Sequence, residues 1–73
     1  MSGNPAGAER DFKTAISLAP ERTEALENIA NLYSKHKRPV LAKYYYSLAK
    51  RVGAGGSVSE KEVKKIMNKS EFF

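Results

Sequence analysis

Apolar residues recur every three or four positions through most of the chain, which is the spacing of an amphipathic helix. The apolar face of the first run consists of Ala8, Phe12, Ala15 and Ile16. The run stops at Pro20, and because proline cannot continue a helix we expect this helix over residues 8–20. Residues 1–7 are small and polar and predict a flexible arm.

Two further helical runs follow. Thr23 is placed to cap the second helix, whose apolar face consists of Leu26, Ile29, Ala30 and Tyr33. The polar run 35–38 breaks this pattern, and Pro39 is placed to open a third helix over residues 39–52. The broad apolar face of the third helix consists of Leu41, Ala42, Tyr45, Tyr46, Leu48, Ala49 and Val52.

Glycines and a capping signature mark the start of the last helix, expected over residues 59–69. Gly53 suits the left-handed residue that ends a helix. Ser59 and Glu62 have the spacing of a capping box, and Val58 and Val63 are placed as a hydrophobic staple around it. Residues 70–73 are expected to form a tail. Since no window alternates apolar and polar residues for long, we predict an all-α fold of four helices.

The chain is similar to the tetratricopeptide-repeat family, because part of its pattern repeats at an offset of 34 residues, the period of that family. The repeated positions are Ala8 and Ala42, Phe12 and Tyr46, Ala15 and Ala49, and Pro20 and Ala54. Leu26, Ile29-Ala30 and Tyr33 match the first helix of a full repeat. The resemblance implies a half repeat (8–20), a full repeat (23–56) and a following helix, with Ala30 and Ala42 letting paired helices approach closely.

The resemblance also has departures. Lys37 stands where the family usually has glycine between paired helices, and Ala54 stands in place of the closing proline. Lys50 stands where an apolar residue is expected. These changes suggest that the array ends here and that the last helix serves as a polar-faced cap.

In the family geometry, the exposed residues of the first helix of a repeat line a concave face that binds a partner's peptide or helix. The corresponding partner-binding residues here are Glu24, Glu27, Asn28, Asn31 and Lys35. The amides of Asn28 and Asn31 are suited to clamp a peptide backbone. The alternative is that all five are ordinary solvated residues. Members that bind chaperone tails have a lysine where Glu27 stands, so capture of an acidic carboxylate-ended tail is not expected.

The net charge of +5 is unevenly distributed, because no acidic residue lies between Glu27 and Glu60. The basic surface expected from this stretch consists of Lys37, Arg38, Lys43, Lys50 and Arg51. Such a surface favours charged partners, and with Tyr44 nearby it suggests nucleic-acid binding as the main alternative to protein binding. No reader motif for nucleic acid is recognisable.

Composition argues against an enzyme or a metalloprotein. With no cysteine and one histidine, the ligands of a Cys/His zinc site are missing. No Gly-rich phosphate loop has the right context, and neither the Glu24/Glu27 pair nor His36 has a nucleophile beside it. We therefore expect no catalytic residue and no cofactor. No apolar run approaches the ~20 residues of a membrane span, no signal peptide is recognisable, and cysteine-free composition suits the cytoplasm.

The function expected from the resemblance is protein–protein interaction, as an adaptor, co-chaperone or assembly factor. The first helix lacks the helix that would pair with it, so we expect Phe12 and Ile16 to be partly exposed. Association, as a homo-oligomer or a heterocomplex, is the favoured way to cover them. The alternative is that the chain covers itself with its end, since Phe72 and Phe73 are expected to dock in a groove.

Overall fold

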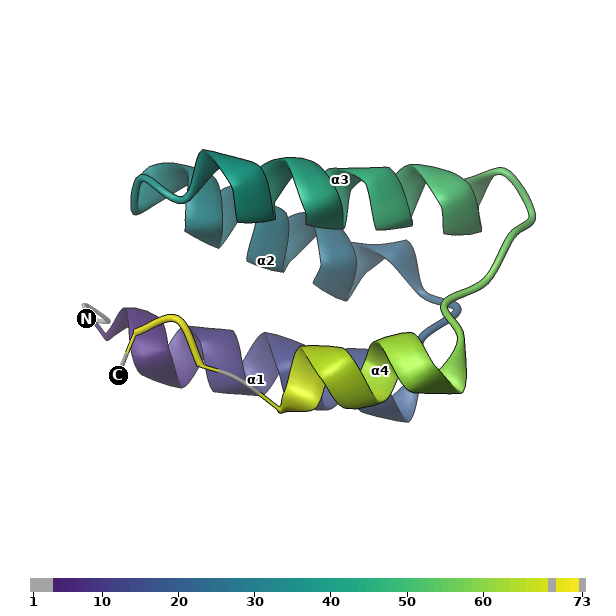
Figure 1. Cartoon of the computed structure of the whole chain (residues 1–73), viewed down its shortest axis with the longest axis horizontal. Coiled ribbons are helices and arrows are strands. Elements are labelled where there is room, and N and C mark those ends of the chain that lie inside the picture. The colour runs from purple at the N-terminus through teal and green to yellow at the C-terminus, as the bar shows by residue number, and fades with distance from the viewer. Residues whose placement is uncertain (1–3, 69, 73) are drawn as a thin grey trace.

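The computed structural model describes residues 4–68 and 70–72, and within those ranges its regular elements are all helices. These are α1 (Pro5–Leu18), α2 (Thr23–Lys35), α3 (Pro39–Gly53) and α4 (Glu60–Met67). The predicted all-α fold of four helices is confirmed. Successive helices run in opposite directions, with α2 and α3 in one layer and α1 and α4 in the other (Figure 1).

Helix α1 begins earlier than predicted, at Pro5, so the expected flexible arm is wrong for residues 5–7. The side-chain oxygen of Asn4 accepts hydrogen bonds from the backbone N–H groups of Ala6 and Gly7, at 3.1 and 3.3 Å. A capping side chain and a proline in the first turn both favour a helix start, which outweighs the small polar composition. Of the rest of the expected arm, Asn4 is the N-cap of α1 and residues 1–3 lie outside the described ranges.

Other helix ends also differ from prediction by one or two residues; α3 ends at Gly53 and not at 52, and α4 covers Glu60–Met67 within the predicted range 59–69. Helix α1 ends at Leu18 rather than at Pro20, because Ala19 precedes the proline and leaves the helical conformation, with φ −145° and ψ 73°. Helix α2 begins at Thr23, but its N-cap residue is Arg22, and no side chain caps it. The prediction of Thr23 as the cap is therefore wrong by one position.

The hairpin of α2 and α3 is the most extensive helix pair of the fold. Ala30 and Ala42, the small residues expected at this contact, are 0% and 5% exposed. The turn passes through Lys37 with a positive φ of 61°, the conformation that favours the glycine expected here from the family pattern. After α3, the positive φ of 99° belongs to Gly55 and not to Gly53, which is the last helical residue, so that prediction is wrong by two positions.

The predicted capping box at the start of α4 is confirmed. The Glu62 N–H donates to Ser59 Oγ at 3.2 Å, and the Ser59 N–H donates to Glu62 Oε1 at 2.9 Å. Val58, the staple residue before the cap, is 7% exposed, and Val63 packs against the same core. The capping signature therefore fixes where the chain turns back after the glycine-containing loop.

Helix α4 packs against α1 and makes no comparable contact with α3 (Figure 1). The chain therefore closes on its own first helix, whereas the repeats of an open stack contact only their neighbours in sequence. Ile66 of α4 and Ile16 of α1 belong to one core, and Ile16 is 0% exposed. The expectation that Ile16 is partly exposed is wrong, because α1 is covered by the end of the same chain. Phe12 is half-buried, as expected.

Candidate functional site

The five residues predicted to bind a partner lie along the exposed side of α2. All five are exposed in the structure, and they are Glu24, Glu27, Asn28, Asn31 and Lys35. They do not line one common face, because a groove runs along each side of α2 and divides them. Lys35 lines neither groove.

The first groove lies between α1 and α2 and has a volume of about 460 Å³. Its apolar part comes from α1, where Phe12 is half-buried and Leu18 is 80% exposed. Glu24 and Asn28 line the α2 side of the same groove. An exposed apolar surface with hydrogen-bonding groups along it is typical of a surface that receives another protein segment. We call this the α1/α2 groove.

The second groove lies between α2 and α3 and brings Glu27 and Asn31 together with Tyr46 and Lys50. The hydroxyl of Tyr46 donates a hydrogen bond to Asn31 Oδ1. Tyr46 is 40% exposed, so the prediction that it packs as part of the apolar face is wrong in part. The bond uses the acceptor of the Asn31 amide, which leaves its two N–H donors as the groups suited to a peptide carbonyl.

The five predicted basic residues are all exposed, and they are Lys37, Arg38, Lys43, Lys50 and Arg51. Two of them, Arg38 and Arg51, make contacts within the chain. Arg51 Nη2 lies 2.7 Å from Glu62 Oε1, and this hydrogen bond, with that from the Ser59 N–H, lowers the pKa of Glu62 to about 2. Arg38 lies with its guanidinium carbon 5.6 Å from the ring centre of Phe72. The arrangement therefore offers fewer cations to phosphate than the sequence suggested.

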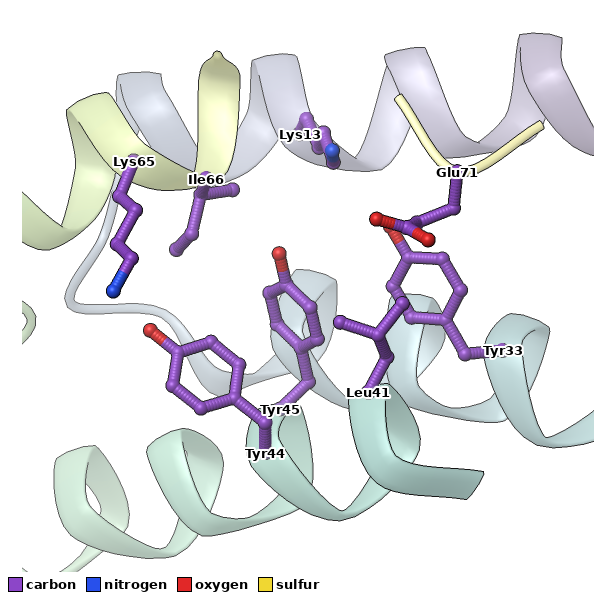
Figure 2. A pocket seen from close by; sticks show the side chains of 8 residues that line it. All are labelled: Lys13, Tyr33, Leu41, Tyr44, Tyr45, Lys65, Ile66 and Glu71. Atoms are coloured by element: carbon purple, nitrogen blue, oxygen red, sulfur yellow. The ribbon is translucent and has the colours of Figure 1, made fainter. Parts of the chain in front are cut away.

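A small cavity of about 190 Å³ lies between α3 and the layer formed by α1 and α4. Figure 2 shows the hydroxyls of Tyr44 and Tyr45 reaching into it from α3, with Lys65 reaching in from α4. Burial raises the pKa of Tyr45, so this hydroxyl stays protonated. The cavity lies on the side of α3 that faces this layer, where α4 packs on α1 and not on α3.

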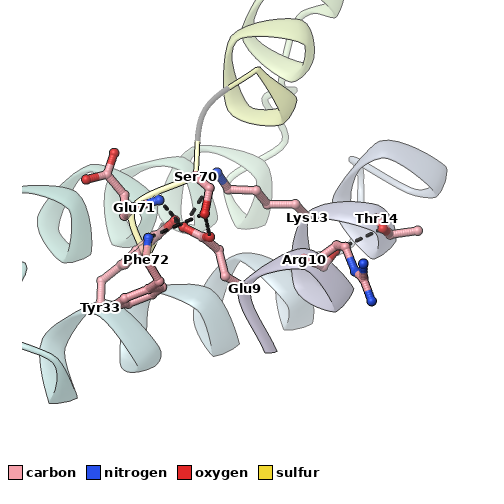
Figure 3. A network of polar contacts seen from close by, with 8 residues as sticks. All are labelled: Glu9, Arg10, Lys13, Thr14, Tyr33, Ser70, Glu71 and Phe72. Carbon is pink, nitrogen blue, oxygen red and sulfur yellow. Dashed lines mark hydrogen bonds and ion pairs between the residues drawn. The ribbon is translucent and has the colours of Figure 1, made fainter. Parts of the chain in front are cut away.

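Among the described residues, the most enclosed charged side chain is that of Glu9 in α1, which is 2% exposed. Its Oε2 accepts from the Tyr33 hydroxyl at 2.7 Å and from the Glu71 N–H at 2.9 Å (Figure 3). Its Oε1 accepts from Ser70 Oγ at 2.6 Å. Lys13 Nζ lies 3.7 Å from Oε2 and completes the surroundings.

This environment decides the charge of Glu9. Burial by itself raises the pKa of the carboxyl, because it disfavours the charged form. The hydrogen bonds from Ser70, Tyr33 and the Glu71 N–H, together with the charge of Lys13, outweigh burial and lower the pKa below its ordinary value. Glu9 is therefore a buried anion held by donors from three separate parts of the chain.

Sequence reasoning missed this carboxylate, although a signal was present. Glu9 lies three residues before Phe12 and seven before Ile16, so it falls on the buried face of α1. An acidic residue on an apolar face, with Lys13 four positions later, indicates a buried charge that needs partners. The donors in residues 70–71 are 61 and 62 positions away and no local pattern points to them.

Comparisons with known proteins identify no relative of this chain. No protein-family model, curated protein sequence or solved structure matches the chain. Among the described residues, no group of His, Asp or Glu side chains is arranged to hold a metal ion. Within those same ranges no helix has the length and apolar character to cross a membrane.

Proposed function

We propose that this chain is a protein-binding module of the tetratricopeptide type that receives an amphipathic helix of another protein in the α1/α2 groove. The observation that carries the proposal is Leu18, a large apolar side chain 80% exposed at the edge of a groove whose floor includes Phe12. In helix-in-groove binding, an amphipathic helix lays its apolar face into an apolar groove.

The polar residues of the groove support the same occupant. Glu24 and Asn28, one turn apart on α2, lie on the side facing Phe12 and Leu18. A helix whose apolar stripe covers Leu18 would bring its own polar side chains against these two residues. An adaptor or assembly role follows from this mode of binding, since the chain would hold a partner without acting on it chemically.

The experiment compares Leu18→Ser with Val40→Ser, because Val40 is also 80% exposed but lies at the start of α3. Proteins retained by the immobilised wild-type chain are identified, and the affinity of the purified partner is then measured for each variant. We expect Leu18→Ser to weaken binding by about tenfold or more, as at a well-packed interface position. Val40→Ser should leave the affinity unchanged.

Thermal melts of both variants serve as the folding control, and neither should change by much, because both side chains are exposed. Equal retention of every partner by the wild type and by Leu18→Ser would contradict the proposal. Loss of binding that instead followed Lys43→Ala, with a steep dependence on salt, would favour the nucleic-acid alternative.

A further inference from the structure

Residues 70–72 lie against the rest of the chain in the way that a bound peptide lies on its receptor. Ser70 Oγ and the Glu71 N–H donate to the two different oxygens of the Glu9 carboxylate, at 2.6 and 2.9 Å (Figure 3). The Phe72 N–H donates back to Ser70 Oγ at 3.3 Å, which fixes the turn of the segment. A side-chain hydroxyl and a main-chain N–H therefore meet one buried carboxylate together.

The ring of Phe72 enters a slot formed by three other side chains. It stacks on Tyr33 with ring centres 5.9 Å apart, and the His36 ring meets it edge-on at 5.4 Å. The Arg38 guanidinium lies near its face, a cation–π arrangement. The sequence predicts docking of Phe72 on this chain or on another, with association favoured; in the structure Phe72 docks on its own chain, which is the alternative. Phe73 lies outside the described residues.

The slot is built by the α2–α3 turn, not by the segment that fills it. Lys37, with its left-handed backbone, separates His36 from Arg38, and both of these flank the same ring. Arg38 Nη1 also donates to the His36 carbonyl oxygen at 3.3 Å. The receptor groups belong to α1, α2 and this turn, so residues 70–72 are a ligand joined to their receptor only through α4 and its loop.

We propose that Glu9, Tyr33, His36 and Arg38 form a second protein-recognition site, for segments with a hydroxyl residue, any residue and then phenylalanine, and that residues 70–72 occupy it until such a segment of another protein displaces them. The hydroxyl is required because it satisfies Glu9 Oε1. The middle residue can vary because its hydrogen bond to Glu9 comes from its main-chain N–H. The third residue is aromatic because it fills the slot between Tyr33 and the α2–α3 turn.

Residues 70–72 are covalently joined to the rest of the chain, and this sets how strongly a segment of another protein must bind to displace them. A segment joined by a short linker has an effective concentration of about millimolar at its site, so a free peptide competes poorly with it. Weakening the binding of residues 70–72 should raise the apparent affinity of the free peptide in proportion to the fraction of sites that become empty. This site is separate from the α1/α2 groove, and it involves neither Leu18 nor Asn28.

The test uses the full chain and a synthetic peptide of residues 68–73, Asn-Lys-Ser-Glu-Phe-Phe, followed through amide chemical shifts. The Ser70→Ala plus Phe72→Ala chain should bind this peptide about tenfold more tightly than the wild type does. Shifts should concentrate at Glu9, Tyr33 and His36. Peptides with alanine in place of the serine or of the first phenylalanine should bind about tenfold more weakly.

Two further measurements make the outcome decisive. Adding Glu9→Gln to the double variant should weaken peptide binding about tenfold, whereas adding Leu18→Ser should not change it, which separates this site from the proposed α1/α2 partner site. If the double variant loses its helical circular dichroism, Phe72→Ala alone replaces it, with displacement read from the Glu71 amide. A folded variant that shows no shifts with the peptide at millimolar concentration would overturn the proposal.

Discussion

The hydroxyl of Tyr33 donates a hydrogen bond of 2.7 Å to Glu9 Oε2, and both side chains are almost fully enclosed. The bond joins α1 to α2 across 24 positions of sequence at the point where residues 70–72 also meet the chain. Burial is the main cause of a raised pKa of Tyr33, and the bond to the Glu9 carboxylate raises it further, so the Tyr33 hydroxyl stays protonated and can donate to Glu9. Its ring, meanwhile, supports the ring of Phe72.

Removing this hydroxyl should destabilise the fold. Tyr33→Phe takes one donor from a buried anion and is expected to lower the free energy of unfolding by about 1.5–3 kcal/mol, the range for bonds to charged groups. Urea unfolding followed by circular dichroism measures it. The matched control is Tyr46→Phe, which removes a bond to Asn31 on the exposed side of α2 and should cost about 0.5 kcal/mol or less. Equal losses of stability in the two variants would contradict the prediction that the buried Tyr33 bond contributes more than the exposed Tyr46 bond.

Stability should fall in acid through Glu9. Its pKa in the folded chain is below the ordinary 4.5, so the ionised carboxylate stabilises the fold above that pH. This contribution is lost as the pH falls through the folded pKa and Glu9 takes up a proton. The difference in the free energy of unfolding between the wild type and Glu9→Gln should therefore shrink as the pH falls below 4.5. The Glu62–Arg51 pair titrates equally in both proteins, so a difference independent of pH would contradict the prediction.

Replacing Lys37 with glycine should stabilise the chain. A left-handed backbone costs a residue with a β-carbon about 1–2 kcal/mol, and glycine avoids that cost. Part of the gain, about 0.4–1 kcal/mol, is offset by the greater freedom of glycine in the unfolded chain. We expect a rise in melting temperature for Lys37→Gly and a fall for Lys43→Gly, in the middle of α3. A fall in both would argue against strain at Lys37.

The close contact of α2 and α3 should not tolerate a larger side chain. Ala42→Leu places a larger side chain at a 5% exposed position and is expected to cost about 1–3 kcal/mol. Ser47→Leu, on the exposed side of the same helix, should change the melting temperature little. A thermal melt compares the two, and similar values would refute the packing assigned to Ala42.

The cap of α4 should matter although the helix is short. Ser59→Ala removes the acceptor of the Glu62 N–H and should cost about 0.5–2 kcal/mol. Ser57→Ala, in the exposed loop before it, is the control and should be neutral. Amide hydrogen exchange in residues 60–67 should quicken in the first variant only. Unchanged exchange in both would contradict the role of the capping box.

Local patterns predicted the elements of this fold well, because capping and apolar spacing act over a few residues. The starts of α3 and α4, and the burial of Ala30 and Ala42, followed from such patterns. What they could not predict was the return of α4 to α1, which depends on which surfaces meet in three dimensions. The same limit hid the Glu9 site, whose donors lie in different segments. It also placed the five α2 residues on one face, whereas the structure divides four of them between two grooves and leaves Lys35 outside both.

The return of α4 to α1 also orders events during synthesis. The α2–α3 hairpin contains only neighbouring segments and can form as soon as residue 53 is available. Glu9 lies 61 positions before Ser70, so it can obtain the donors of Ser70 and Glu71 only after both have left the ribosome. Until then α4 and residues 70–72 are not yet packed against α1. We therefore expect α1 to become fully enclosed only after residues 60–71 have been made.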